Sequence, residues 1–243
     1  MGTAVTQVFF LGLVTAVATG LGALPFAFVR EVSQRTVAVA HAIACGLMLG
    51  ASFGLILEGS AYGTPQTITG GVVGVVFILA GERFLHGRDV QFGELRGVGA
   101  RQMLLILAVM TLHSFSEGVA VGVAFGGGER LATLITLAIA VHNVPEGLAI
   151  SAVMRPKGKS VTSCAWWSVF SSLPQPLMAV PAFLFVDTFR PILPYGLGFA
   201  AGAMVLMVFL ELLPEAYGGA SKTRVALWVS ITLGAMILFQ RYL

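Results

Sequence analysis

The sequence predicts an all-α integral membrane protein whose chain crosses the bilayer eight times. Three observations support this fold class. Of the 243 residues, 57% are hydrophobic and 10% are charged, whereas about a quarter of the residues of a soluble domain carry charge. The apolar residues fall into eight runs, each close to the ~20 residues that a membrane-spanning helix needs. Lys and Arg, in turn, are concentrated in every second loop between these runs.

The eight runs are separated by Gly, Pro and charged residues, as helix ends in a membrane protein should be. The first run resembles a signal peptide in its hydrophobicity, but it lacks a basic start and is too long, so we interpret it as a helix. We expect a single transmembrane domain over residues 1–243, with helices at about 4–29, 36–57, 66–83, 102–125, 131–154, 161–186, 192–213 and 224–240.

The distribution of positive charge predicts the orientation of the chain. Eleven Lys and Arg residues lie in the loops after the first, third, fifth and seventh spans, and only three lie elsewhere. Positively charged loops remain on the cytoplasmic side of a membrane. Both termini are therefore expected to be extracytoplasmic. The same positive charge is divided among short loops, so it indicates no nucleic-acid partner.

Two internal repeats relate the spans to one another. His113 and Glu117 in the fourth span recur as His142 and Glu146 in the fifth. An offset of 156 residues aligns the first span with the sixth and the second with the seventh, through matched Pro, Met and Phe residues among others. By the predicted orientation the paired helices run in opposite directions. This arrangement indicates an inverted repeat, and such folds hold their substrate near the membrane midplane.

The repeated His and Glu indicate a metal site. Residues four apart lie on the same face of a helix, so each helix directs one imidazole and one carboxylate the same way. A charge at this depth costs at least ~2.5 kcal/mol, and the spans contain no Lys or Arg near His113 or His142 that could compensate it. Two neutral imidazoles and two carboxylates give no net charge with one divalent cation. This ligand set suits Zn²⁺ and also Fe²⁺, Mn²⁺, Co²⁺ or Ni²⁺.

Neighbouring polar residues and prolines add to this site. Ser114 and Asn143 each follow a ligand histidine and are candidate oxygen ligands or partners of the ligands. Pro145 should free a backbone carbonyl and kink the fifth span. Pro174 and Pro176 flank Gln175 in the sixth span, which predicts an irregular backbone lining a cavity. Two other groups are expected to have plainer environments: His41 and His86 as solvated side chains, and the two cysteines as buried apolar side chains.

The segments "HSFSEG" at 113–118 and "HNVPEG" at 142–147 resemble the paired metal-site motifs of the ZIP (Zrt-/Irt-like) divalent-metal transporters, as does "FAAGAMVLMVFLELLPEA" at 199–216. This resemblance covers nearly the whole chain. It implies a 3+2+3 helix arrangement with the metal site between the fourth and fifth spans. It also implies transport into the cytoplasm of zinc, or of Fe²⁺, Mn²⁺ or Cd²⁺, by an elevator-like movement of one helix group.

Carried over by position, the family's ligand positions correspond to His113, Ser114, Glu117, His142, Asn143, Glu146 and Met48. Two departures are evident. Ser114 stands where many members have Asn or Asp, and Gln175 stands where many have Glu. Without that carboxylate the site offers a second divalent ion little compensation, so we expect one metal per chain, with Gln175 as a neutral oxygen donor.

Two other functions use the same residues. An intramembrane metal-dependent hydrolase could bind its metal with this His/Glu set, although the H-E-x-x-H motif of metalloproteases is absent. A proton-coupled carrier could use the pairs as a relay. We expect a transporter rather than an enzyme, with no cofactor other than the transported ion. The short loops suit a bacterial inner membrane, and a homodimer is compatible with the sequence.

Overall fold

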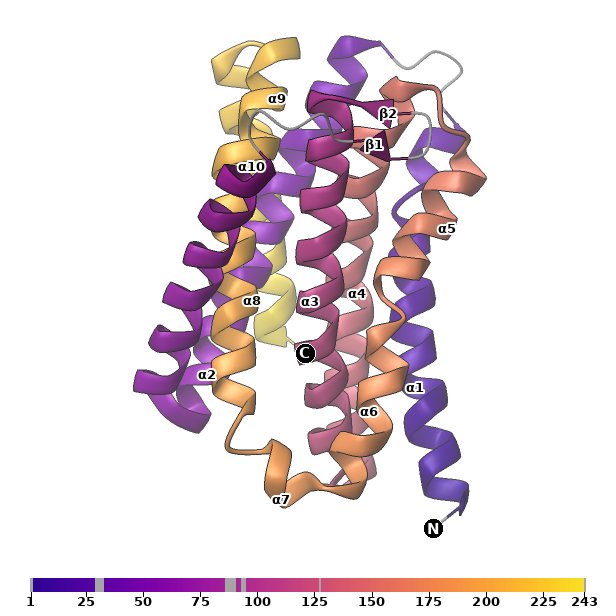
Figure 1. The fold of residues 1–243 in the computed structure, drawn as a ribbon, viewed down its shortest axis with the longest axis vertical. Helices are drawn as coiled ribbons and strands as arrows, with labels where there is room; N and C mark the ends of the chain where they lie inside the picture. The colour runs from indigo at the N-terminus through magenta and orange to yellow at the C-terminus, as the bar shows by residue number, and fades with distance from the viewer. Residues whose placement is uncertain (1, 29–32, 86–90, 93–94, 127, 243) are drawn as a thin grey trace.

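The computed structural model is a bundle of long helices (Figure 1), and it describes the chain apart from residues 1, 29–32, 86–90, 93–94, 127 and 243. The α-helices are α1 (Gly2–Leu21), α2 (Gln34–Leu85), α3 (Val98–Gly126), α4 (Glu129–Met154), α5 (Val161–Ser171), α6 (Pro174–Leu184), α7 (Val186–Phe189), α8 (Leu193–Met207), α9 (Leu213–Gly219) and α10 (Lys222–Tyr242). Two 3₁₀ turns, η1 (Leu24–Ala27) and η2 (Arg155–Lys157), follow α1 and α4, and a π-helical turn, η3 (Val208–Leu212), joins α8 to α9.

Six helical segments in the described part of the chain are long and apolar enough to cross a membrane. This confirms the all-α integral membrane class, because helices satisfy their own backbone hydrogen bonds in lipid. Each of the eight predicted spans corresponds to helix in the structure, but two of them are joined within α2 and a third is divided between α5 and α6. The count of eight crossings and the placement of the termini stay predictions.

Helix α2 is a hairpin of two helices rather than one rod. The backbone leaves helical geometry at Gly63, where φ is 171° and ψ is 104°. A Cβ added at Gly59 would lie 2.7 Å from the hydroxyl oxygen of Thr67, eight positions along the chain. In a straight helix these residues would be ~12 Å apart. The chain therefore turns back here, at the lower end of the view in Figure 1, as the break between the second and third predicted spans requires.

Prolines determine where two other helices are interrupted. Helix α5 ends at Ser171 and α6 begins at Pro174, a first-turn position that suits a residue without an N–H. This is the irregular backbone that the sequence predicted. Further along, Pro214 removes one backbone donor, and the helix widens into η3 in the preceding turn. By contrast, α4 is assigned as one helix through Pro145.

A short antiparallel strand pair was not expected. Strand β1 (Gln91–Phe92) pairs with β2 (Leu95–Arg96), Gln91 lying opposite Arg96 and Phe92 opposite Leu95. The pair lies in the loop between α2 and α3, at the upper end of the molecule in Figure 1. A segment this short has too few residues to show an alternating pattern in the sequence.

Close contacts at glycines reveal the internal repeat in three dimensions. A Cβ at Gly147 on α4 would lie 1.7 Å from the backbone oxygen of Thr19 on α1, and one at Gly118 on α3 would lie 2.5 Å from that of Gln175 on α6. Thr19 and Gln175 are 156 residues apart, which is the predicted offset. The contact of α4 with α1 is thus repeated by the contact of α3 with α6, as an inverted repeat requires.

The same kind of contact holds a second group of helices together. Glycines of α2 lie against α10 at Gly46 and Gly50, and against α8 at Gly70 and Gly74. In lipid, small residues allow this close backbone approach, which stabilises helix pairs by dispersion and weak hydrogen bonds. The bundle therefore contains two sets of glycine-packed helices: α1, α3, α4 and α6 form the first set, and α2, α8 and α10 form the second.

Two predictions about single residues have different outcomes. Cys45 and Cys164 are buried free thiols, as expected. The prediction that His41 is solvated is wrong: this side chain is 1% exposed, and neither ring nitrogen has a hydrogen-bond partner among the described residues. His41 is the eighth residue of α2, about two turns from the helix start, and its position in the sequence alone does not reveal that it is buried. His86, also predicted to be solvated, falls outside the residues that the structure describes.

Candidate metal centre

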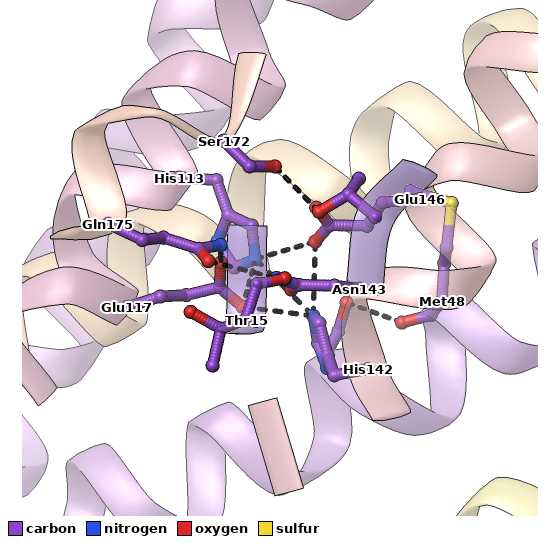
Figure 2. Close-up of polar contacts among 11 residues, drawn as sticks. Thr15, Met48, His113, Glu117, His142, Asn143, Glu146, Ser172 and Gln175 are labelled. Atoms are coloured by element: carbon purple, nitrogen blue, oxygen red, sulfur yellow. Dashed lines mark hydrogen bonds and ion pairs between the residues drawn. The ribbon is translucent and has the colours of Figure 1, made fainter. Parts of the chain in front are cut away.

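Four side chains from two neighbouring helices converge in the middle of the bundle (Figure 2). His113 and Glu117 come from α3, and His142 and Glu146 come from α4. Each pair is four residues apart, so each helix presents both groups on one face. His113, Glu117 and Glu146 are at most 1% exposed, and His142 is 5% exposed. The structure thus brings together the four residues that the repeated motif singled out.

The spacing of the four ligand atoms fits a single small cation. The two Nε2 atoms of His113 and His142 are 3.3 Å apart. Their distances to the Oε1 atoms of the two glutamates are 2.8, 3.2, 3.3 and 3.9 Å, and all four atoms lie within 4.8 Å of one another. A tetrahedron with metal–ligand bonds of ~2.0–2.1 Å has edges of about 3.3–3.4 Å. The observed distances span that value.

The polar atoms of the centre lack the partners that burial demands. Oε1 of Glu117 and both carboxylate oxygens of Glu146 accept no hydrogen bond among the described residues. The two Oε1 atoms contact only the imidazoles of the ion pairs given above, within the described residues. A buried polar group left without a partner costs about 1–3 kcal/mol, and more when it is charged. A divalent cation bound between the four groups would satisfy these oxygens and neutralise both carboxylates.

A chain of amides surrounds one side of the centre. The Gln175 side-chain amide on α6 donates to Oε2 of Glu117. Its carbonyl oxygen accepts from Nδ2 of Asn143 at 3.0 Å, and the same nitrogen donates to the backbone carbonyl of Thr15 on α1 at 2.8 Å. Gln175 and Asn143 are both fully buried. The amides therefore hold the Glu117 carboxylate in place and tie α6, α4 and α1 together around it (Figure 2).

Two other predicted site residues, Ser114 and Met48, form no hydrogen bond to the four His and Glu side chains among the described residues. Ser114 is fully buried and its hydroxyl has no hydrogen-bond partner among the described residues. Met48 on α2 is also fully buried and lies at the margin of the group in Figure 2, where its backbone carbonyl accepts a hydrogen bond from Ser52. Roles for Ser114, Met48, Asn143 and Gln175 as direct ligands stay predictions.

Sequence reasoning missed the polar residues that α1 and the α5–α6 break contribute. Thr15 supplies the carbonyl bound by Asn143, and the hydroxyls of Thr19 and Ser172 are 2.8 Å apart. Both threonines and the serine are fully buried. A hydroxyl in an apolar span is a weak signal, because it can bond to its own helix backbone. The repeat could have found Thr19, which aligns with Gln175.

Comparisons with known proteins agree with the geometry of the centre. Residues 85–240 match the family model described as ZIP Zinc transporter. The chain is 44% identical over 236 residues to a proposed zinc transporter of Arabidopsis thaliana, an alignment that covers 96% of this chain but 38% of that relative. It is 33% identical over 220 residues to the zinc transporter ZIPB of Bordetella bronchiseptica, covering 85% and 71% of the two chains. It is 29% identical over 221 residues to the zinc transporter GufA of Myxococcus xanthus, covering 85% and 87%. This chain therefore belongs to the ZIP family of zinc transporters.

Proposed function

We propose that this protein carries divalent transition-metal ions, zinc foremost, into the cytoplasm through the centre formed by His113, Glu117, His142 and Glu146. The observation that carries the proposal is the burial of four donors at the spacing of one tetrahedral ion. Membership of a family whose members are named zinc transporters supports it. Fe²⁺, Mn²⁺ and Cd²⁺ are the alternative cargoes, because imidazole and carboxylate oxygen accept several divalent ions.

The centre with one bound divalent ion is electrically neutral, which makes its movement through the apolar bundle less costly. Two carboxylates balance one divalent charge, and the imidazoles bind as neutral donors. The loaded centre then carries no net charge through the apolar part of the bundle, which removes most of the cost of moving a charge there. The amides of Gln175 and Asn143 hold the Glu117 side of the centre in place while the loaded centre moves.

An elevator-like movement is supported by how the helices are joined. The first set, α1, α3, α4 and α6, holds the centre and is joined by glycine contacts such as Gly147 with Thr19 and Gly118 with Gln175. The second set, α2, α8 and α10, has glycine contacts of its own. Close backbone contacts resist sliding within each set. A close contact between the sets, that of Gly196 of α8 with Ser116 of α3, involves a side chain instead, so we place the relative movement at the surface between the sets. Movement of one helix group against the other around the substrate site is typical of inverted-repeat carriers.

The direction of transport is inferred from charge. Arg101 lies in the first turn of α3, Arg155 and Lys157 lie in η2, and Lys222 and Arg224 lie in the first turn of α10. The charge rule assigns these helix ends to the cytoplasm. A bacterial inner membrane is our proposed location, supported by the bacterial relatives that this chain covers over most of their length. A homodimer remains part of the proposal.

A hydrolase is less compatible with this geometry. Catalytic zinc usually has three protein ligands and an open position for water, whereas here four donors lie at the spacing of a complete tetrahedron. The relatives are named as transporters. A proton-coupled carrier of another solute would need no such spacing, since a relay needs only a chain of hydrogen-bond distances.

The proposal is tested by metal uptake into vesicles that contain purified protein. Single alanine variants of the four ligands should lose most uptake of Zn²⁺ while remaining folded, because each removes one of four donors. Asp187→Ala is the matched control, since it removes an exposed carboxylate far along the chain from the centre. Uptake of Fe²⁺, Mn²⁺ and Cd²⁺ in parallel would rank the cargoes. Wild-type uptake in any two ligand variants would refute the assigned centre.

A further inference from the structure

A cavity of about 580 Å³ leads away from one side of the metal centre. Its inner wall includes Glu117 and His142, and its outer wall includes Glu58 of α2 and Arg241 of α10. Arg241 is exposed, whereas Glu117 is 1% exposed, so the cavity runs from the bundle interior to the surface. It follows the first half of α4 and the end of the first helix of α2. Both segments lie toward the lower end of Figure 1, the end predicted to be extracytoplasmic.

Glu58 is the one carboxylate in this cavity besides Glu117 among the lining residues. Its side chain is half-buried, and no hydrogen bond or ion pair of Glu58 is found among the described residues. Arg241 lines the same cavity but forms no ion pair with Glu58 within the described structure. In the described part of the chain, the Glu58 carboxylate therefore has no competing protein partner when a cation enters the cavity on its way to the centre.

The cavity is large enough for a cation that keeps its water. One water molecule occupies about 30 Å³ of liquid, so a shell of six waters takes about 180 Å³. The cavity holds about 580 Å³, roughly three times that volume. The neutral amide of Gln240 on α10 lies against Gly54, which is one helical turn before Glu58 on α2. A Cβ added at Gly54 would lie 2.5 Å from Nε2 of Gln240. An amide there can accept hydrogen bonds from the waters of a bound ion.

We propose that Glu58 captures a hydrated divalent cation in this cavity and delivers it to the Glu117–His142 side of the metal centre. This inference rests on the proposed transport function. One carboxylate and an adjacent amide hold a hydrated ion loosely, and the fixed positive charge of Arg241 keeps the ion from being trapped. The four-ligand centre, which can strip the water and replace it with its own donors, then takes over the ion. Glu58 is thus a positioning residue and not a ligand of the centre.

The experiment compares Glu58→Gln with wild type in vesicle uptake of Zn²⁺ at low ionic strength. A carboxylate and a divalent ion about 6 Å apart in water attract by the equivalent of about a tenfold change in equilibrium constant. The KM for uptake should therefore rise about tenfold, while the maximal rate and the equilibrium affinity of the centre for Zn²⁺ stay near wild type. Glu58→Asp should recover most of the loss. Asp187→Asn, which removes an exposed acidic charge outside the cavity, should leave the KM unchanged.

The salt dependence of the KM for Zn²⁺ uptake is a second measurement, and it tests the role of Glu58 in wild type even if Glu58→Gln does not fold. Raising the ionic strength from 0.02 M to 0.5 M should raise the KM of wild type, because salt screens the capturing charge. Glu58→Asp should show the same dependence, and Glu58→Gln a weaker one. A KM that is equal in wild type and Glu58→Gln, or insensitive to salt in wild type, would overturn the role of Glu58. Wild-type protein that takes up no metal would refute the proposed function itself.

Discussion

Replacing Gln175 by Glu should change both the stability of the metal-free protein and the number of ions that it binds. Gln175 is fully buried, and its amide donates to Glu117. A carboxylate in its place would face another carboxylate across about 4 Å. At an effective dielectric of ~20, two unit charges at that separation repel by about 4 kcal/mol. Taking up a proton at pH 7 against a reference pKa of ~4.3 costs about 3.7 kcal/mol, so protonation gives little relief.

The assay is thermal unfolding of the purified Gln175→Glu variant, with and without Zn²⁺, together with metal analysis after equilibrium dialysis. Without metal, the midpoint should fall by about 8–16 °C if ~4 kcal/mol is lost at about 2–4 °C per kcal/mol. With excess Zn²⁺, most of the loss should be recovered, and the stoichiometry should rise from one ion per chain toward two. The added carboxylate offsets the charge of a second ion.

Gln175→Met is the matched control, because it keeps the volume and removes the hydrogen bonds without adding charge. It should lower the midpoint without changing the stoichiometry. Our reasoning would be refuted by a Gln175→Glu variant that binds one ion and unfolds like wild type when metal-free. It would equally be refuted by a metal-loaded structure of wild type with two fully occupied ions at the centre.

Three further predictions follow from the same structure. Zn²⁺ affinity should fall by up to about 100-fold between pH 7.5 and pH 5.5, because two imidazoles with reference pKa values of ~6.5 must lose protons to bind; a flat affinity in a competition titration would contradict histidine ligation. Gly147→Ala should unfold at a much lower temperature than wild type, because its Cβ would lie 1.7 Å from a backbone oxygen. The control Gly234→Ala, whose Cβ would have nothing within 4 Å, should leave the unfolding temperature unchanged or raise it. Lys157→Met should lower the free energy of unfolding by about 0.5–1.5 kcal/mol, because Lys157 donates to the Val153 carbonyl at 2.9 Å and to the Gln102 amide at 3.3 Å; unchanged denaturant midpoints would show that neither contact matters.

The sequence predicted that these four side chains come together, because helical periodicity is a local property. His113 with Glu117, and His142 with Glu146, share a face in any helix, and two such helices in sequence readily place their faces together. The break between the second and third spans and the break at Pro174 were equally local, since glycine weakens a helix and proline removes a backbone donor at its own position. For the same reason the class of fold followed from apolar runs alone.

Features that depend on contacts between distant segments could not be predicted in this way. The burial of His41 depends on which helices cover α2, and the cavity beside Glu58 depends on how α10 lies against α2 and α4. Spans built from Leu, Ala, Val and Gly offer many similar packing surfaces, so the sequence alone does not select one. The glycines after Glu117 and Glu146 were noticed as parts of a motif. That they admit the backbones of α6 and α1 became clear only in three dimensions.

The positions of Thr19 and Gln175 have a consequence for how an ion rests in the protein. The two halves of the molecule are alike where backbone touches backbone, at Gly147 and Gly118, yet equivalent positions beside the cargo carry a short hydroxyl in one half and a long amide in the other. If the two halves were fully symmetric around the site, an ion would have two binding positions of equal affinity, one near each half. We therefore expect a single preferred ion position, on the side of the centre where Gln175 donates to Glu117. The internal repeat provides the framework of the site, and its local departure from symmetry favours one ion position over two.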